Sequence, residues 1–168
     1  SWCDTAYAFS EGKKQSRAEV RNEVHRLARA FVRRQAIRKR REKGAKQALV
    51  VPPPGPWLPS VPMVELTGGE PLLQKGSLLL MKELCDDGYT VLLETSGAHD
   101  IASVDRRVHR IVDLKCPSSG ESERNRWENI GCLGLQDELK FVIATRQDYE
   151  WAKATIAQYR LDSVCSLL

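Results

Sequence analysis

Apolar residues in the first third of the chain recur at helical spacing. Four of them share one face of an α-helix, because they are separated by four, three and four residues. They are Val20, Val24, Leu27 and Phe31. Ser16 and Glu19 precede this face in the Ser-x-x-Glu order of a capping box, and Gly44 is a residue type at which helices commonly end. The pattern predicts a helix from about residue 17 to residue 43, packed along its first half and solvated along its second.

From Met63 onward, short apolar runs alternate with helix-like segments. The runs predicted as strands are 63–67, 90–94, 110–115, 138–143 and 163–167. The segments predicted as helices are 72–87, 101–108, 127–135 and 147–159. Strands that alternate with helices through short loops are typical of parallel βα units, so we expect an α/β fold rather than an antiparallel sheet.

Composition narrows the class of protein. A chain of 168 residues has the size of one domain, and its 42% hydrophobic share excludes disorder over the whole length. No run approaches 18 apolar residues, so no membrane span is predicted. The five cysteines include no C-x-x-C pair, which indicates neither a zinc ribbon nor a disulfide framework. We therefore expect reduced thiols and a cytoplasmic location.

Charge is unevenly distributed along the chain. Residues 11–50 contain fourteen Lys and Arg but four acids, a net charge of +10, whereas the remaining residues sum to −6. The chain is thus predicted to carry a basic arm on an acidic body. Residues 51–62 follow this arm and include six prolines, which exclude a helix and favour an extended linker.

Polar residues gather where the predicted strands end. They are Thr67-Gly68-Gly69-Glu70-Pro71, Glu94-Thr95-Ser96-Gly97 and Lys115-Cys116-Pro117-Ser118-Ser119-Gly120. Parallel strands bring such ends to one edge, so we expect a single site there.

Each of these motifs also has a purely structural interpretation. The glycine pair either exposes backbone to a ligand or forms a tight turn before a helix that starts at Pro71. Glu94 either faces the site or pairs with a cation such as Lys115, and the same alternatives hold for Asp113 and Lys140. The three histidines have no metal-ligand spacing.

Five motifs follow one another along the chain. They are Cys3-Asp4-Thr5-Ala6-Tyr7-Ala8-Phe9, Glu65-Leu66-Thr67-Gly68-Gly69-Glu70-Pro71-Leu72-Leu73-Gln74, Leu93-Glu94-Thr95-Ser96-Gly97, Asp113-Leu114-Lys115-Cys116-Pro117-Ser118-Ser119-Gly120 and Asp137-Glu138-Leu139-Lys140-Phe141-Val142-Ile143. In this order they resemble the motifs of radical S-adenosylmethionine (SAM) enzymes, and among these the 7-carboxy-7-deazaguanine synthase (QueE) family. The resemblance covers residues 1–9 and 63 to about 160.

This resemblance implies a partial (β/α) barrel with a 4Fe–4S cluster on a C-x3-C-x2-C loop, SAM and Mg²⁺. The implied enzyme is a lyase of queuosine and 7-deazapurine biosynthesis. It converts 6-carboxy-5,6,7,8-tetrahydropterin to 7-carboxy-7-deazaguanine with loss of ammonia, using radical chemistry that SAM supplies. The implied partners are the pterin substrate, an electron donor such as flavodoxin and, in the full-length protein, a second copy of the chain.

The resemblance also implies roles for single residues, none of them catalytic. Cys3 corresponds to the third cluster cysteine, Thr5 to the Mg²⁺-binding threonine and Thr67 to a substrate contact. The residues that it places against SAM are Trp2, Asp4, Gly69, Glu70, Ser118 and Ser119.

The chain departs from the family pattern at both ends and in one internal segment. The first two cluster cysteines and the family's first strand would precede Ser1, and a further strand would follow Leu168. We therefore expect residues 1–168 to form a single incomplete radical SAM domain that is inactive by itself. Residues 31–62 are interpreted as an insertion, because the family passes almost directly from a helix into the Gly-Gly-Glu-Pro strand.

Two other functions fit the sequence. The basic helix over residues 17–46 could serve a nucleic-acid-binding or interaction module, although its basic run over residues 33–41 has almost no interleaved aromatic residues for base stacking. Alternatively, the chain could be a catalytically dead relic that keeps the fold without the chemistry.

Overall fold

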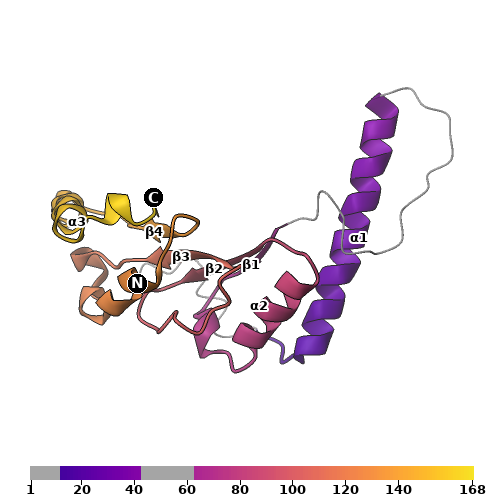
Figure 1. Cartoon of the computed structure of the whole chain (residues 1–168), viewed down its shortest axis with the longest axis horizontal. Coiled ribbons are helices and arrows are strands. Elements are labelled where there is room, and N and C mark those ends of the chain that lie inside the picture. Colours follow the sequence, from indigo (N-terminus) through magenta and orange to yellow (C-terminus); the bar gives the residue numbers. More distant parts are fainter. Residues whose placement is uncertain (1–11, 43–62) are drawn as a thin grey trace.

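The computed structural model describes residues 12–42 and 63–168 and contains a parallel sheet flanked by helices (Figure 1). The α-helices are α1 (Arg17–Glu42), α2 (Ser77–Asp86) and α3 (Arg146–Tyr159). The strands are β1 (Val64–Leu66), β2 (Val91–Thr95), β3 (His109–Asp113), β4 (Glu138–Lys140) and β5 (Ser166–Leu167). The 3-10 helices are η2 (Pro71–Leu73), η3 (Pro117–Ser119), η4 (Ser122–Arg124), η5 (Trp127–Cys132) and η6 (Leu161–Ser163).

The five strands form one sheet in chain order, β1-β2-β3-β4-β5, and every neighbouring pair is parallel. The α/β fold and the parallel sheet predicted from the alternation are therefore confirmed. Since all five strands run in the same direction, their last residues lie along one edge, called here the carboxyl edge.

The hydrophobic core lies on one face of the sheet. Val91 and Leu93 of β2 are buried there together with Met81 and Leu84 of α2. Burial alternates along β2, as expected for a strand with one face on a core, and Glu94 therefore points to the opposite face. Burying each of these aliphatic side chains contributes about 1.5–3 kcal/mol relative to leaving it exposed.

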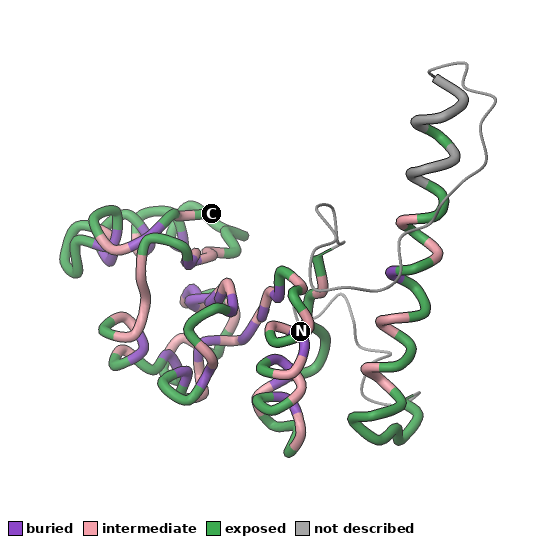
Figure 2. The backbone as a smooth tube through the Cα atoms, turned by 45° about the vertical axis from the view of Figure 1, so that its right-hand side comes forward, coloured by how far each residue is buried: buried purple, intermediate pink, exposed green. Residues whose placement is uncertain are grey.

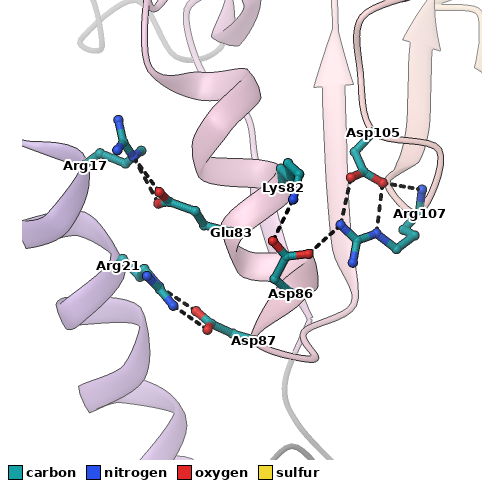
Figure 3. A network of polar contacts seen from close by, with 8 residues as sticks. All are labelled: Arg17, Arg21, Lys82, Glu83, Asp86, Asp87, Asp105 and Arg107. Atoms are coloured by element: carbon teal, nitrogen blue, oxygen red, sulfur yellow. Dashed lines mark hydrogen bonds and ion pairs between the residues drawn. The ribbon is translucent and has the colours of Figure 1, made fainter.

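Helix α1 is fixed to the body by its first half. Arg17 pairs with Glu83 at 3.0 Å, and Arg21 pairs with Asp87, so two arginines of α1 reach two carboxylates at the end of α2 (Figure 3). Ala28 is buried, whereas Leu27 is 53% exposed, so the packed face is narrower than the apolar spacing predicted. Beyond Ala28 exposed positions dominate the described part of the helix (Figure 2), and this confirms the prediction of a solvated second half.

Three predicted helices differ from the structure. The segment 72–87 is divided into η2 and α2, which starts after Gly76, and residues 127–135 form only the 3-10 helix η5. Residues 101–108 form turns instead of a helix. In that segment the carboxylates of Asp100 and Asp105 accept hydrogen bonds from the backbone N–H groups two residues later. Such side-chain bonds offer the backbone an alternative to helical hydrogen bonds.

Part of the predicted insertion over residues 31–62 lies outside the described residues, since only residues 31–42 of it are described, as the end of α1. Over the described ranges, no helix combines the length and the apolar content needed to cross a bilayer.

A buried ion pair joins β3 to the segment before β4. The carboxylate of Asp137 accepts hydrogen bonds from the Arg110 backbone N–H at 2.9 Å, from Arg110 Nε at 3.0 Å and from the backbone N–H of Gly134 at 2.9 Å. The Asp137 side chain is 0% exposed and that of Arg110 8%. Burial raises the pKa of Asp137, but these donors outweigh burial and hold it below its usual value.

We expect Asp137→Asn to destabilise the fold by about 3–5 kcal/mol, because it leaves the Arg110 guanidinium buried without a counter-charge. Urea unfolding followed by circular dichroism measures the loss. Glu121→Gln is the control, since it breaks the exposed pair between Arg124 and Glu121 and should cost less than about 1 kcal/mol. Equal losses in the two variants would contradict a structural role for the buried pair.

Candidate functional site at the carboxyl edge

Polar side chains from three strands meet on the face of the sheet opposite the core. Thr67 Oγ1 donates to Glu94 Oε2 at 2.9 Å, and Lys140 Nζ donates to Glu94 Oε1 at 2.6 Å. Thr67 directly follows β1, Glu94 lies in β2 and Lys140 ends β4. β2 and β4 are separated by β3, so Glu94 connects strand ends that are not neighbours. The Glu94 and Lys140 side chains are 29% and 38% exposed, so a ligand can reach them.

The charge state of Glu94 determines the direction of the hydrogen bond that it forms with the Thr67 hydroxyl. The hydrogen bond from Lys140 lowers the pKa of Glu94 most, and the Thr67 hydroxyl lowers it further against the effect of burial. Glu94 is therefore a carboxylate at neutral pH and can only accept hydrogen bonds. Because the Thr67 proton is donated to Glu94, the Thr67 oxygen offers lone pairs to a ligand that carries an N–H or O–H group.

A second ion pair lies at the end of β3. Lys115 Nζ contacts Asp113 Oδ2 at 2.5 Å, and Asp113 pairs in register with Lys140. Asp113 Oδ1 is buried and accepts no hydrogen bond within the described part of the chain. Of the sequence alternatives, the cation paired with Glu94 is Lys140, while Lys115 pairs with Asp113.

The glycine pair after β1 forms an open turn. Gly68 and Gly69 have φ values of +80° and +56°, a region that favours glycine. Both are exposed, and no heavy atom lies within 4 Å of the place that a Cβ would occupy on either residue. The backbone of this turn is therefore accessible to a small polar ligand.

Glu70 holds this turn against the end of β2. Its carboxylate accepts hydrogen bonds from the Leu72 backbone N–H at 3.0 Å, the Thr95 hydroxyl at 2.8 Å and the Ser96 backbone N–H at 2.9 Å. Burial raises the pKa of Glu70, and the hydrogen bonds from Ser96, Leu72 and Thr95 lower it by more. Both oxygens are thus used within the protein, which makes Glu70 a residue that positions the glycine turn.

The loop after β3 is fastened in a similar way. Ser118 donates its backbone N–H to Asp148 Oδ1 at 3.0 Å and its hydroxyl to Asp148 Oδ2, while the Ser119 hydroxyl donates to the Cys116 carbonyl at 2.6 Å. Asp148 also belongs to the capping box that starts α3 at Thr145. Sequence reasoning missed Asp148, although the Thr-x-x-Asp spacing before an apolar segment is a recognisable cap signal.

The described residues provide no cluster-type metal site. Within the described ranges, no group of three or more His, Cys, Asp or Glu side chains could hold a metal ion. Cys116 is buried near the carboxyl edge, and burial, followed by Asp148 and Asp113, raises its pKa to about 11, so it is a protonated thiol rather than a metal-ligating thiolate. The predicted site residues Trp2, Cys3, Asp4 and Thr5 lie outside the described residues.

Comparison with known proteins identifies relatives for nearly the whole chain. A 7-carboxy-7-deazaguanine synthase of Koribacter versatilis is 40% identical over 167 residues, which are 99% of this chain and 60% of that protein. Its counterpart in Chlorobaculum tepidum is 47% identical over 111 residues, 64% of this chain and 50% of the relative. This chain is a relative of the 7-carboxy-7-deazaguanine synthases.

The resemblance seen in the motifs is thereby confirmed, and the roles of single residues remain predictions. A 7-carboxy-7-deazaguanine synthase of Thermoplasma acidophilum is 29% identical over 160 residues, 94% of this chain and 61% of the relative. The chain thus spans about 60% of the length of two of these relatives and half of the third. No family model matches the chain.

We expect Lys140→Met to raise the pKa of Glu94, because its strongest hydrogen-bond donor is removed. Lys115→Met should raise the same pKa less, since Lys115 acts on Glu94 only through its charge. Carboxyl-carbon NMR titration measures both shifts. A larger effect of Lys115→Met would contradict the pairing described here.

The same pair predicts a pH dependence of stability. The pKa of Glu94 is lowered on folding from an ordinary value of 4.5, so the pair stabilises the fold above that pH. This contribution is lost as the pH falls through the folded pKa, and it should be smaller in Lys140→Met, in which Thr67 and Lys115 still lower the pKa of Glu94.

Proposed function

We propose that this chain is the SAM- and substrate-binding part of a radical SAM 7-carboxy-7-deazaguanine synthase. The observation that carries the proposal is the 40% identity to such a synthase over 99% of this chain. The geometry supports it, because the glycine turn, Thr67 and the Ser118 loop all lie along the carboxyl edge, where parallel α/β folds bind ligands.

The fold that we propose is a single incomplete radical SAM domain over residues 1–168, built as part of a (β/α) barrel and interrupted by the insertion 31–62. Strands in chain order, all parallel, are the arrangement that such barrels repeat. The contacts of Glu94 with both Thr67 and Lys140 support a curved sheet, since the ends of β1, β2 and β4 meet on one face.

The described residues fit SAM better than they fit a cluster. The open backbone of Gly68 and Gly69 suits the amino and carboxylate groups of a methionine moiety. When bound, SAM would supply the radical chemistry through a 4Fe–4S cluster. The described cysteines do not fit that cluster, and Cys3 is the one cysteine assigned to it, so turnover requires two further thiolates at the C-x3-C-x2-C spacing.

The proposed reaction converts 6-carboxy-5,6,7,8-tetrahydropterin to 7-carboxy-7-deazaguanine with loss of ammonia. In it, Thr67 accepts a hydrogen bond from an N–H group of the substrate, Glu94 and Lys140 hold the Thr67 hydroxyl in that orientation, and Glu70 holds the glycine turn against SAM. The proposal also includes Mg²⁺ bound with the help of Thr5, an electron donor such as flavodoxin, assembly as a homodimer and a cytoplasmic location.

The activity is tested by anaerobic reconstitution with iron and sulfide, followed by detection of 7-carboxy-7-deazaguanine and ammonia. We expect product only from a longer protein that supplies two further thiolates ahead of Cys3 together with the strands that the family resemblance places at both ends. Absence of product from that extended protein would contradict the proposed function and favour a relic.

SAM binding can be tested on the chain itself. We expect Gly69→Ala to weaken SAM binding about tenfold, because a methyl group would project from the turn that meets the ligand. Gly88→Ala is a matched control, since Gly88 also has a positive φ, +87°, and precedes β2 at the opposite edge of the sheet. Each alanine costs roughly 1–2 kcal/mol of backbone strain. Isothermal titration calorimetry should therefore give a weaker SAM affinity for Gly69→Ala than for Gly88→Ala, whereas thermal unfolding should give similar stabilities for the two variants. Equal SAM affinities would overturn the assignment of Gly69 to the SAM site.

A further inference from the structure

The backbone of β3 continues past the point at which β2 ends. The last register pair between these two strands joins Thr95 with Val112. On the other side of β3 the pairing goes further, because the Leu114 backbone N–H donates to the Lys140 carbonyl at 2.9 Å. Backbone groups of successive residues in a strand point in opposite directions, so those of Lys115 point to the side on which β2 has already ended.

Asn125 takes the position that a further residue of β2 would have. Its Oδ1 accepts a hydrogen bond from the Lys115 backbone N–H at 2.9 Å, and its Nδ2 donates to the Lys115 carbonyl at 2.9 Å. A side-chain amide carries an acceptor and a donor side by side, so it can pair with both backbone groups of one residue. Because Asn125 is only 7% exposed, little water can replace its amide at these two groups.

This pairing determines where the Lys115 side chain lies. Residues that are two apart in an extended segment share a face, and Lys115 Nζ accordingly contacts Asp113 Oδ2 at 2.5 Å. Asp113 is in register with Lys140, which donates to Glu94, so Lys115 lies on the face of the candidate site. The Lys115 side chain is 31% exposed. An ammonium has three donors, and Asp113 uses one, so the others can meet an anionic group of a ligand.

We propose that Asn125 is a positioning residue, which extends β3 beyond the end of β2 and thereby holds the Lys115 ammonium on the face of the candidate site. The inference rests on the proposed function, because the anionic group that Lys115 meets is a carboxylate of a ligand at the carboxyl edge. SAM and the proposed pterin substrate both carry such a group. Asn125 touches no ligand itself, and its effect on binding passes through Lys115.

Asn129 provides a matched control from the same segment of the chain. It is 3% exposed, and its Nδ2 donates to the carbonyl groups of Gly97 at 3.1 Å and His99 at 2.8 Å. Its Oδ1 accepts a hydrogen bond from the Ile101 backbone N–H at 3.3 Å. These bonds hold the loop after β2, and none of them involves Lys115. Loss of either asparagine leaves backbone groups unpaired, so the two variants should lose comparable stability.

The first test measures the pKa of Glu94 in the 168-residue chain by carboxyl-carbon NMR titration. The charge of Lys115 lowers this pKa, so Asn125→Ala should raise it in the same direction as Lys115→Met. In the double variant, Asn125→Ala should add nothing to the effect of Lys115→Met, as expected of two residues that act in series. Asn129→Ala should leave the pKa of Glu94 unchanged.

The second test measures ligand binding by isothermal titration calorimetry. SAM and 6-carboxy-5,6,7,8-tetrahydropterin are titrated separately, which distinguishes the two sources of a carboxylate. Asn125→Ala and Lys115→Met should each weaken the binding of one of these ligands roughly tenfold, the effect of losing one hydrogen bond to a charged group. Asn129→Ala should not. If Asn125→Ala does not fold, Asn125→Ser is measured in its place, because it leaves room for water at the two backbone groups.

Three results would overturn the proposal. They are equal changes of the Glu94 pKa in Asn125→Ala and Asn129→Ala, a further change when Asn125→Ala is added to Lys115→Met, and unchanged affinity of Asn125→Ala for both ligands. If the wild-type chain binds neither ligand, the proposed function fails. The NMR titration uses no ligand, so it still decides whether Asn125 positions Lys115.

Discussion

All five strands run in the same direction, so each delivers its last residue to the same edge of the sheet. The register of the parallel strands brings Thr67, Glu94 and Lys140 together although they are far apart in sequence. The core on the opposite face, formed by α2 and β2, fixes which side chains point away from it. The candidate site is a consequence of this arrangement, and no loop has to fold back to create it.

Three carboxylates hold the loops and side chains at the carboxyl edge in fixed positions. Glu70 fastens the glycine turn to the end of β2, Glu94 connects Thr67 with Lys140, and Asp148 fastens the loop at Ser118 to the start of α3. In each case hydrogen bonds from the protein keep the carboxyl group ionised, because donors lower its pKa by more than burial raises it. The backbone of Gly68 and Gly69 and the lone pairs of Thr67 are thereby left available for a ligand.

The parallel sheet could be predicted from the sequence, because apolar runs that alternate with helix-like segments allow few other folds. The sequence also predicted that the motifs after β1, β2 and β3 lie at one edge, since the carboxyl ends of parallel strands share an edge of the sheet. The sequence could not predict which groups donate hydrogen bonds to each carboxylate. Glu70, for example, is bonded to Thr95 and Ser96, and no local pattern reveals a contact across 25 residues. The turns over residues 101–108 were missed for the opposite reason, because two short aspartate bonds outweighed an apolar spacing that suggested a helix.

The helix that bears the basic arm obeys a different constraint from the sheet. Its first half is held by carboxylates of α2, so its position depends on the body, whereas Arg29 and Arg33 are exposed like charges four residues apart. Like-charged pairs at that spacing destabilise a helix by about 0.2–0.5 kcal/mol each, and salt reduces the effect. The ion pairs of Arg17 and Arg21 with the carboxylates of α2 offset this repulsion, so the helix keeps its place because of its contacts with the body.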